Sequence, residues 1–367
     1  MSIYESLNVR RVINAAAAQT LLGGSVMPEP VLDAMREAAR FYVSVPELHD
    51  RVAERLATLS RNEAACLSAG AAAGILMTTA ACMTYQNLDR VTALPDTTGL
   101  QRTEVIVFRA HRNGFLSAVR ETGATVVEIG GDEEELQAAL SERTAAVMWF
   151  AGGFWGPDEL PLDVTIRIAH AAEVPVVVDA ADQIPPVTRL WEYTTEQGAD
   201  LAIFSGGKGL RGPQSSGLIV GRADLIRACR ANTGPLHSIA RPAKVGKEEM
   251  VGLLAAVEWS IAQDVDEVTA RYDAIVDGWL TGLAGIPGAT LRRVSISHSG
   301  QPIPRALVEV ESAARRDAII AELWERDPRV SVLPEGERSL ALNPQGVAPD
   351  DASLVLSSLT QQLTRIL

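Results

Sequence analysis

The sequence predicts an α/β protein, in which a mostly parallel sheet carries helices on both faces and a smaller C-terminal α+β domain follows. Short apolar, β-branched runs alternate with helical patterns through the first two thirds of the chain, as in parallel strands buried on both faces. After Gly246 the pattern changes to one long helical stretch and then to shorter elements. We expect an N-terminal segment (1–20), a large domain (21–246), a connecting helix (247–278) and a small domain (279–367).

The longest apolar stretch of the chain, Ala64–Met83, is rich in small and polar residues and predicts a buried helix rather than a membrane span. Six strands are then expected at Glu104–Phe108, Thr125–Gly130, Thr144–Ala151, Val174–Asp179, Leu201–Phe204 and Gly217–Val220. Helices are expected at Asp132–Leu140 and Leu162–Ala172, the second favoured by a proline at its start.

The last third of the chain predicts a different arrangement. One long helix is expected from about Lys247 to Gly278. Shorter strands are expected at Leu291–Ile296, Arg305–Val310, Val330–Leu333 and Ser339–Leu342, with helices at Arg315–Arg326 and Asp350–Leu367. This mixture predicts the small α+β domain.

The composition excludes several classes of protein. The chain of 367 residues has 33 basic and 46 acidic side chains, and its net charge of −13 argues against a general nucleic-acid binder. Three cysteines lie far apart, which argues against a disulfide scaffold and a zinc ribbon and favours a reducing compartment. No signal peptide is visible, so we expect a cytoplasmic protein without a metal site or a membrane partner.

The most informative segment surrounds Lys208. A predicted strand ends at Ser205, and Lys208 follows between Gly207 and Gly209, where backbone can approach a ligand closely. Lysine forms Schiff bases with carbonyl cofactors, whereas the alternative is a surface lysine in a turn. The literal G-x-G-x-x-G match at 207–212 is disfavoured as a dinucleotide site, because Pro213 and a strand follow it instead of a helix.

Asp179 ends the apolar strand before that segment. A carboxylate in such surroundings needs a positive partner, and the pairing that we consider is with a protonated pyridine nitrogen; the alternative is a helix N-cap. The strands that end near Asp179 and Lys208 are successive. Both side chains are therefore expected at the same carboxyl edge of the sheet, where ligands bind in open α/β folds.

A phosphate site is expected beside them. The small residues Ser68–Gly74 precede a long helix, whose first amides can hold an anion. Ser205 can add a hydroxyl group to the same phosphate. His111 follows the strand Glu104–Phe108 and is a candidate to stack on a cofactor ring, although a lone histidine is otherwise an ordinary loop residue.

These motifs resemble the selenocysteine synthase-like branch of the fold type I pyridoxal phosphate enzymes, and in particular the glucosaminate-6-phosphate ammonia-lyase type. The resemblance covers most of the chain and rests on these segments: Val12–Ala15, Glu63–Ala65, Ser68–Ala73, Leu94–Gly99, His111–Gly114, Val178–Ala181, Ser205–Gly217 and Arg241–Glu249. Selenocysteine synthase itself is a poorer match, because it carries an additional N-terminal module for tRNA.

The resemblance implies a cofactor, pyridoxal 5'-phosphate, in a fold with a seven-stranded sheet. It implies that Lys208 binds the cofactor covalently, that Asp179 binds the pyridine nitrogen and that His111 stacks on the ring. It further implies cofactor contacts by the residues Gly70, Ala71, Ala72, Gln183 and Ser205. A homodimer or higher homo-oligomer is implied as well, with the site between subunits and the Arg241–Glu249 segment reaching the neighbour.

Two departures affect the substrate contacts. The segment after Asn14 lacks the basic residue that usually follows in the family, and the expected Pro-Arg context in the small domain reads Asn343-Pro344-Gln345 here. Asn14, Arg211 and Arg241 are therefore the candidate substrate residues, with Arg305 as a further anion binder; each arginine has a structural alternative.

The expected reaction is α,β-elimination on a β-hydroxy amino acid or amino sugar acid, which gives a 2-oxo acid and ammonia. Retro-aldol cleavage, racemisation and group transfer are alternatives within the same class, because they share the lysine chemistry and differ in the bond that breaks. A non-catalytic cofactor-binding scaffold is the alternative of a different class. The substrate is expected to be a small-molecule amino acid.

Overall fold

The computed structural model describes residues 2–153 and 158–365, which form two compact units. The large unit comprises Met27–Ala262, and the small unit combines Met1–Val26 with Gln263–Leu367. The N-terminal segment thus belongs with the C-terminal part of the chain. Among the described residues, every helix is too short or too polar to span a membrane.

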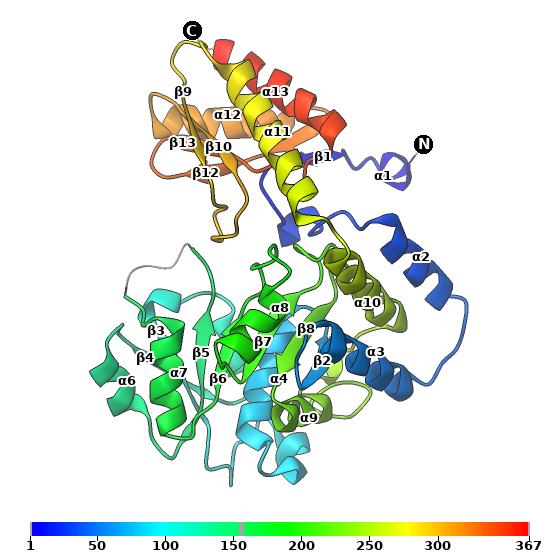
Figure 1. Ribbon diagram of the computed structural model, residues 1–367, viewed down its shortest axis with the longest axis vertical. Helices are drawn as coiled ribbons and strands as arrows, with labels where there is room; N and C mark the ends of the chain where they lie inside the picture. The colour runs from blue at the N-terminus through cyan, green and yellow to red at the C-terminus, as the bar shows by residue number, and fades with distance from the viewer. Residues whose placement is uncertain (1, 154–157, 366–367) are drawn as a thin grey trace. The chain divides into compact units, whose positions relative to one another are not determined.

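The large unit is built on a seven-stranded sheet (Figure 1). Its strands in spatial order are β2 (Ala64–Ser68), β8 (Gly217–Gly221), β7 (Leu201–Ser205), β6 (Val176–Asp179), β5 (Thr144–Phe150), β3 (Glu104–Phe108) and β4 (Thr125–Ile129). Only β8 runs against its neighbours, because it is antiparallel to both β2 and β7. The predicted mostly parallel sheet and its six predicted strands are confirmed.

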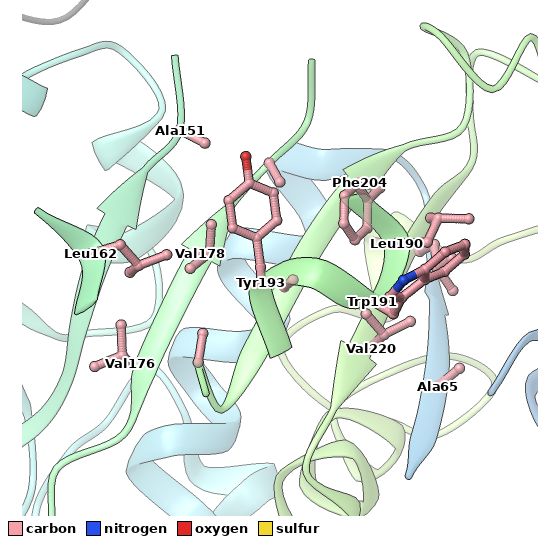
Figure 2. Packing of buried hydrophobic residues seen from close by; sticks show 14 of the residues in the cluster. Ala65, Ala151, Leu162, Val176, Val178, Leu190, Trp191, Tyr193, Phe204 and Val220 are labelled. Atoms are coloured by element: carbon pink, nitrogen blue, oxygen red, sulfur yellow. The ribbon is translucent and has the colours of Figure 1, made fainter. Parts of the chain in front are cut away.

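Two apolar clusters cover the two faces of this sheet. One contains side chains of α3 (Val45–Leu59), α7 (Leu162–Ala171) and α10 (Lys247–Ile261), and Figure 2 shows part of it around Trp191 and Tyr193. The other contains α4 (Ala71–Thr84), α5 (Leu116–Arg120) and α9 (Ala223–Ala231). Neighbouring strand residues alternate between the clusters, which is the period of two expected for a strand buried on both faces.

The apolar stretch predicted as one helix from Ala64 to Met83 is a strand followed by a helix. Ala64–Ser68 is β2, which pairs with β8, and the helix α4 begins only at Ala71. The helical interpretation was wrong for residues 64–70, which form β2 and the bend before α4. Gly70, with φ of +108°, separates the two elements, because this conformation is accessible mainly to glycine.

The predicted connecting helix is likewise two helices. α10 ends at Ile261 in the large unit, and α11 (Val265–Leu283) begins a new helix in the small unit. Asp264 is the reason for the break, because its carboxylate accepts the backbone N–H groups of Asp266 and Glu267 and so caps α11. The division between the units therefore falls at residues 262–263, within the predicted helix.

The small unit has an antiparallel sheet whose strands in order are β12 (Leu333–Glu335), β13 (Ser339–Leu342), β10 (Arg305–Glu309) and β9 (Thr290–Val294). Its helices are α1 (Ile3–Ser6), α11, α12 (Ala313–Glu325) and α13 (Pro349–Thr364). β1 (Val12–Asn14) pairs in parallel with β11 (Arg329–Ser331), which joins the N-terminal segment to this unit.

The remaining helices of the large unit are short connections, apart from α2. They are α2 (Glu29–Ala38), α6 (Glu133–Ala139), α8 (Arg189–Trp191), the 3₁₀ helices η2 (Leu88–Ala93), η3 (Arg109–His111) and η5 (Arg241–Ala243), and the π-helix η4 (Glu192–Glu196). The turn η1 (Thr20–Leu22) lies in the small unit.

Candidate active site

The chemically informative residues of the large unit gather at the carboxyl edge of its sheet. β6 ends at Asp179, β7 ends at Ser205 and β2 ends at Ser68, while β8 begins at this edge with Gly217. Ser68 and Ser205 are both register partners of Gly217, so three neighbouring strands present these residues side by side. The predicted common edge is confirmed, and it is the usual ligand-binding edge of an open α/β sheet.

Asp179 is a buried carboxylate with little local compensation. The residue is 7% exposed, and its Oδ1 accepts the backbone N–H of Ala181 at 3.0 Å. Within the described residues no hydrogen bond reaches Oδ2. Burial raises the pKa of Asp179 to about 6, while the Ala181 amide and the charge of Lys208 act in the opposite direction. A cationic ligand at this position would remove the cost of burial.

Lys208 lies in a tight loop directly after β7. It is half-buried, and its charge is close enough to lower the pKa of Asp179, as the sequence predicts for two groups at one edge. The loop is closed by two backbone hydrogen bonds, from Gly206 N to Ser216 O and from Gly212 N to Gly206 O. The side chain of Lys208 therefore extends from a backbone that hydrogen bonds hold in place, rather than from a free surface turn.

The glycines beside Lys208 serve the protein's own packing. A Cβ atom on Gly207 would lie 2.5 Å from Cα of Gln214, and one on Gly209 would lie 1.7 Å from the carbonyl oxygen of Ile184. Both neighbours are backbone atoms of this chain, and the expected close approach of a ligand to these glycines stays a prediction. Their absent side chains fix the loop that presents Lys208.

The loop between β2 and α4 is a candidate anion cradle. The first intrahelical bond runs from Gly74 N to Gly70 O, so the amides of residues 71–73 have no acceptor within the helix. A Cβ atom on Gly217 would lie 2.8 Å from the carbonyl carbon of Gly70 and 2.5 Å from Oγ of Ser68. The missing side chain of Gly217 thus lets this loop close over the start of β8, beside Ser205.

These groups fit pyridoxal phosphate. The amides at the start of α4, with Ser205 nearby, suit the phosphate; the carboxylate of Asp179 suits a protonated ring nitrogen; and Lys208 suits the aldehyde. The specific contacts predicted for Gly70, Ala71 and Ala72 remain predictions.

His111 has an unexpected environment. Its ring is completely buried, Nδ1 accepts the Phe150 N–H at 3.3 Å, and Nε2 is hydrogen-bonded to Glu159. The ring also makes edge-on contacts with Phe108 and Trp149, with centroids 5.6 Å apart in each pair. Stacking on a cofactor ring stays a prediction, and it requires that one covered face of His111 opens.

Gln183 is buried near the end of β5. Its side-chain amide donates to the carbonyl oxygen of Ala151 at 3.4 Å, and its Oε1 accepts the Tyr193 hydroxyl at 3.3 Å. These contacts fix the side chain of Gln183 at the carboxyl edge of the sheet. Its predicted contact with the cofactor is not tested by them.

The candidate substrate residues have different local roles. Asn14 shapes a turn, since its side chain donates to Ala17 O at 2.7 Å and accepts from Ala16 N at 2.9 Å. The guanidinium of Arg211 lies 5.1 Å from the ring centroid of Trp259. A substrate role for either residue stays a prediction.

The other two candidate arginines, Arg305 and Arg241, have different surroundings. Arg305 is buried in the small unit, where it makes a two-pronged pair with Glu335 at 2.9 and 3.3 Å and donates to Ile296 O. The structural alternative is therefore favoured for Arg305. Arg241 is half-buried, and no ion pair or hydrogen bond of its side chain is present among the described residues, so it keeps its guanidinium available.

Glu159 is not among the residues that the sequence motifs indicate. This residue is the partner of His111 although 48 residues separate them, and no motif marks it. Its position shortly before the predicted helix Leu162–Ala172 was the one available signal.

Comparisons with known proteins identify the family of this chain. The aminotransferase class-V family matches residues 22–242. A 5'-C-glycyluridine monooxygenase-decarboxylase from Streptomyces sp is 34% identical, covering 98% of this chain and 92% of the relative. The D-glucosaminate-6-phosphate ammonia lyase of Salmonella typhimurium is 29% identical, with coverages of 98% and 97%.

A solved structure of a D-glucosaminate-6-phosphate ammonia-lyase superposes with a TM-score of 0.85 at 28% identity, over 100% of this chain and 99% of that one. The predicted family resemblance and fold are confirmed. The cofactor is pyridoxal phosphate, in agreement with the residues at the carboxyl edge. The chain belongs to the aminotransferase class-V family and is a fold type I pyridoxal phosphate enzyme.

Proposed function

We propose that this enzyme is a lyase that removes the β-hydroxyl group and the amino group from a β-hydroxy α-amino acid, with a 2-oxo acid and ammonia as products. One observation carries the proposal. The buried carboxylate of Asp179 lies beside Lys208 without a saturating partner, in a chain that matches an ammonia lyase over nearly its full length. That arrangement supports carbanion chemistry at the α-carbon of an amino acid.

Each residue at the edge has one task in this reaction. Pyridoxal phosphate, when bound, supplies an electron sink for the electron pair of the α-carbon. Asp179 holds a proton on the ring nitrogen, and the amides at the start of α4, with the Ser205 hydroxyl, hold the phosphate. The amine of Lys208 takes the α-proton. The α-proton and β-hydroxyl leave as water, and addition of water then releases ammonia and leaves the 2-oxo acid.

The names of the two relatives support the substrate class. One acts on an amino acid derived from a sugar, and the other on a uridine that carries a glycyl group at its 5' carbon. Both names describe an α-amino acid joined to a polyhydroxylated carbon framework. We infer that the substrate of this enzyme is an amino acid with a sugar-like side chain, and that Arg241 is the candidate to bind its negative charge.

Oxidative decarboxylation is a second candidate, because a monooxygenase-decarboxylase is 34% identical to this chain. The same residues at the edge would serve it, since both reactions begin at the α-carbon of an amino acid. The two differ in stoichiometry: an oxidative decarboxylation consumes oxygen and releases carbon dioxide, whereas an elimination releases ammonia.

The test is a product assay on purified protein with pyridoxal phosphate and a panel of β-hydroxy amino acids that includes amino sugar acids. Ammonia and a 2-oxo acid in equal amounts, without oxygen uptake, support the elimination. Carbon dioxide with oxygen uptake supports the second candidate. Glycine plus an aldehyde, or the opposite enantiomer, would replace both with aldol cleavage or racemisation. A protein that forms no borohydride-reducible link to the cofactor contradicts the whole proposal.

We further propose a homo-oligomer in a reducing compartment such as the cytoplasm. Cys66, Cys82 and Cys229 are all buried free thiols, which is typical of such a compartment. The segment Arg241–Glu249 is the candidate to reach the site of a neighbouring subunit. Size-exclusion chromatography with light scattering tests the first part, and complementation between Lys208→Ala and Arg241→Ala subunits tests the second.

A further inference from the structure

The two nitrogens of the buried His111 ring have fixed and different partners. Nδ1 faces the backbone N–H of Phe150 at 3.3 Å, and a backbone N–H can only donate. Nδ1 is therefore the unprotonated acceptor. Nε2 carries the proton and donates it to the carboxylate of Glu159. The geometry thus assigns a neutral imidazole in the Nε2–H tautomer.

The His111 imidazole accepts a hydrogen bond at the end of β5, which is the strand next to Asp179. β3 pairs with β5 only as far as Val107 and Met148, so the N–H of Phe150 lies beyond the last pair of that ladder. His111 takes the place of the missing strand on that side. On the other side Phe150 is the register partner of Asp179, whose carbonyl oxygen accepts the N–H of Ala151 at 2.9 Å. The ring therefore braces the strand that holds the backbone of Asp179.

Glu159 is itself held in position by the protein. A Cβ atom on Gly131 would lie 2.6 Å from the backbone nitrogen of Glu159 and 2.4 Å from the carbonyl carbon of Asp158. On the other side, Nε1 of Trp149 donates to the carbonyl oxygen of Leu160 at 3.2 Å. Two contacts thus fix the backbone around Glu159, so its carboxylate is placed against His111 rather than drawn from a freely moving loop.

We propose that Glu159 is a positioning residue of the cofactor site. Its carboxylate holds the His111 ring in one tautomer and one orientation, and through Phe150 the ring fixes the end of β5 against Asp179. A charge-assisted hydrogen bond suits this task, because it is stronger and more directional than a bond between neutral groups. The inference rests on the proposed cofactor chemistry at this edge, but it concerns contacts that exist without the cofactor.

The first experiment tests the contact itself in cofactor-free protein. The sequence contains five histidines, so selective ¹⁵N labelling of histidine gives a simple imidazole spectrum. We expect a strongly deshielded N–H proton for His111, which disappears in His111→Asn and in Glu159→Ala and moves upfield in Glu159→Gln. The His170–Asp200 pair, at 2.8 Å, is an internal reference that none of these changes should move. An unchanged His111 signal in both Glu159 variants would refute the contact.

The second experiment measures cofactor binding and the absorption spectrum of the bound cofactor. Glu159→Ala should bind pyridoxal phosphate up to about tenfold more weakly and alter its spectrum, because His111 then no longer holds the end of β5 against Asp179, and the loss of a charged hydrogen bond sets a limit of this order. Glu159→Gln keeps an acceptor and should stay within about threefold of wild type. Glu133→Ala removes a neighbouring surface carboxylate paired with Arg167, and this control should bind like wild type.

The possible outcomes separate the two proposals. Equal affinity and an equal spectrum in wild type and Glu159→Ala refute the positioning role and leave the proposed reaction intact. Failure of the wild-type protein to bind the cofactor refutes the proposed reaction, and the imidazole spectrum still decides the contact. If Glu159→Ala does not fold, Trp149→Phe tests the role, since it removes the N–H that fixes Leu160 and should weaken cofactor binding relative to Glu133→Ala. Wild-type affinity in Trp149→Phe would then refute the role.

Discussion

Two buried aspartates at opposite ends of the same sheet have contrasting surroundings. Asp200, directly before β7, is saturated: it accepts from Arg222 at 2.6 Å, from His170 at 2.8 Å and from the backbone N–H of Val176 at 2.8 Å. Asp179, at the end of β6, accepts one backbone N–H. The comparison indicates that a buried carboxylate with a full set of hydrogen bonds stabilises the fold. A buried carboxylate with few hydrogen bonds instead has a charge that a ligand can pair with.

The pKa shifts at the amino and carboxyl ends of the sheet differ in the same way as the hydrogen bonding of the two aspartates. At the amino end, hydrogen bonding to Asp224 and the charge of Asp200 raise the pKa of Arg222, and the same pairing lowers the pKa of Asp224. At the carboxyl end, burial raises the pKa of Asp179 to about 6. The amino-end charges stabilise one another, and the carboxyl-end charge is costly until a cation binds.

The largest effects are expected when one positively charged side chain is removed at each end of the sheet. Lys208→Ala should abolish the borohydride-reducible link to the cofactor and lower activity by more than about 10³-fold while the fold persists. Arg222→Ala should instead lower the free energy of unfolding by about 3 kcal/mol, because it leaves the buried charge of Asp200 uncompensated. Mass spectrometry after reduction and chemical denaturation measure the two results. A reducible link that survives in Lys208→Ala would disprove the lysine assignment.

Neutralising the two acids in cofactor-free protein should change stability in opposite directions. Asp179 has a folded-state pKa of about 6, above its ordinary value of 3.8, so the folded protein binds this proton more tightly than the unfolded chain. The charged form then costs stability above pH 6, and the cost vanishes below about pH 4. Asp179→Asn should therefore raise the free energy of unfolding at pH 8 by up to about 3 kcal/mol.

Asp200→Asn is the matched control and should lower the free energy of unfolding by about 2 kcal/mol, since it weakens three hydrogen bonds. Urea denaturation at pH 4.5 and pH 8 checks both variants, and the gain for Asp179→Asn should shrink at the lower pH. A loss of stability in Asp179→Asn at pH 8 would show that the carboxylate is compensated after all. The same variant should lose most of its activity with cofactor.

Alanine substitution of the glycines at the two ends of β8 should have smaller effects, on cofactor affinity at one end and on stability at the other. In Gly217→Ala the new methyl group meets Gly70 and Ser68 and opens the anion cradle, so cofactor affinity should fall about tenfold. In Gly221→Ala it meets the carbonyl oxygen of Asp200 at 2.1 Å with φ of +138°, so stability should fall by about 2 kcal/mol. Cofactor titration and denaturation of both variants test this; equal affinities would remove Gly217 from the phosphate site.

The smallest effect is expected for Ser205→Ala. Removing one neutral hydroxyl group from the phosphate site should weaken cofactor binding about fivefold, because a neutral hydrogen bond contributes about 1 kcal/mol. Ser215→Ala, at an exposed position of the following loop, is the control and should bind like wild type. Fluorescence titration with the cofactor distinguishes them. Identical affinities in both variants would exclude Ser205 as a phosphate ligand.

Local patterns predicted most of the large unit. Residues 176–178 are apolar and β-branched, which favours a buried strand, and Asp179 follows at its end. The same reasoning placed Lys208 at the same edge, since parallel strands share their carboxyl ends. Ala64–Ser68 could not be predicted as a strand, because alanine favours helices and its pairing partner β8 lies about 150 residues away in the sequence.

The sequence by itself determined the chemistry of this protein: a lysine and an aspartate at neighbouring strand ends, small residues before a helix, and the family to which these motifs belong. Residue type and period are local properties, and they persist whatever the rest of the chain does. The tertiary structure alone decided which polar groups are left unsaturated, where the chain divides into two units, and that Glu159 meets His111. Those outcomes depend on contacts between distant segments, and burial sets their energies only after the chain has folded.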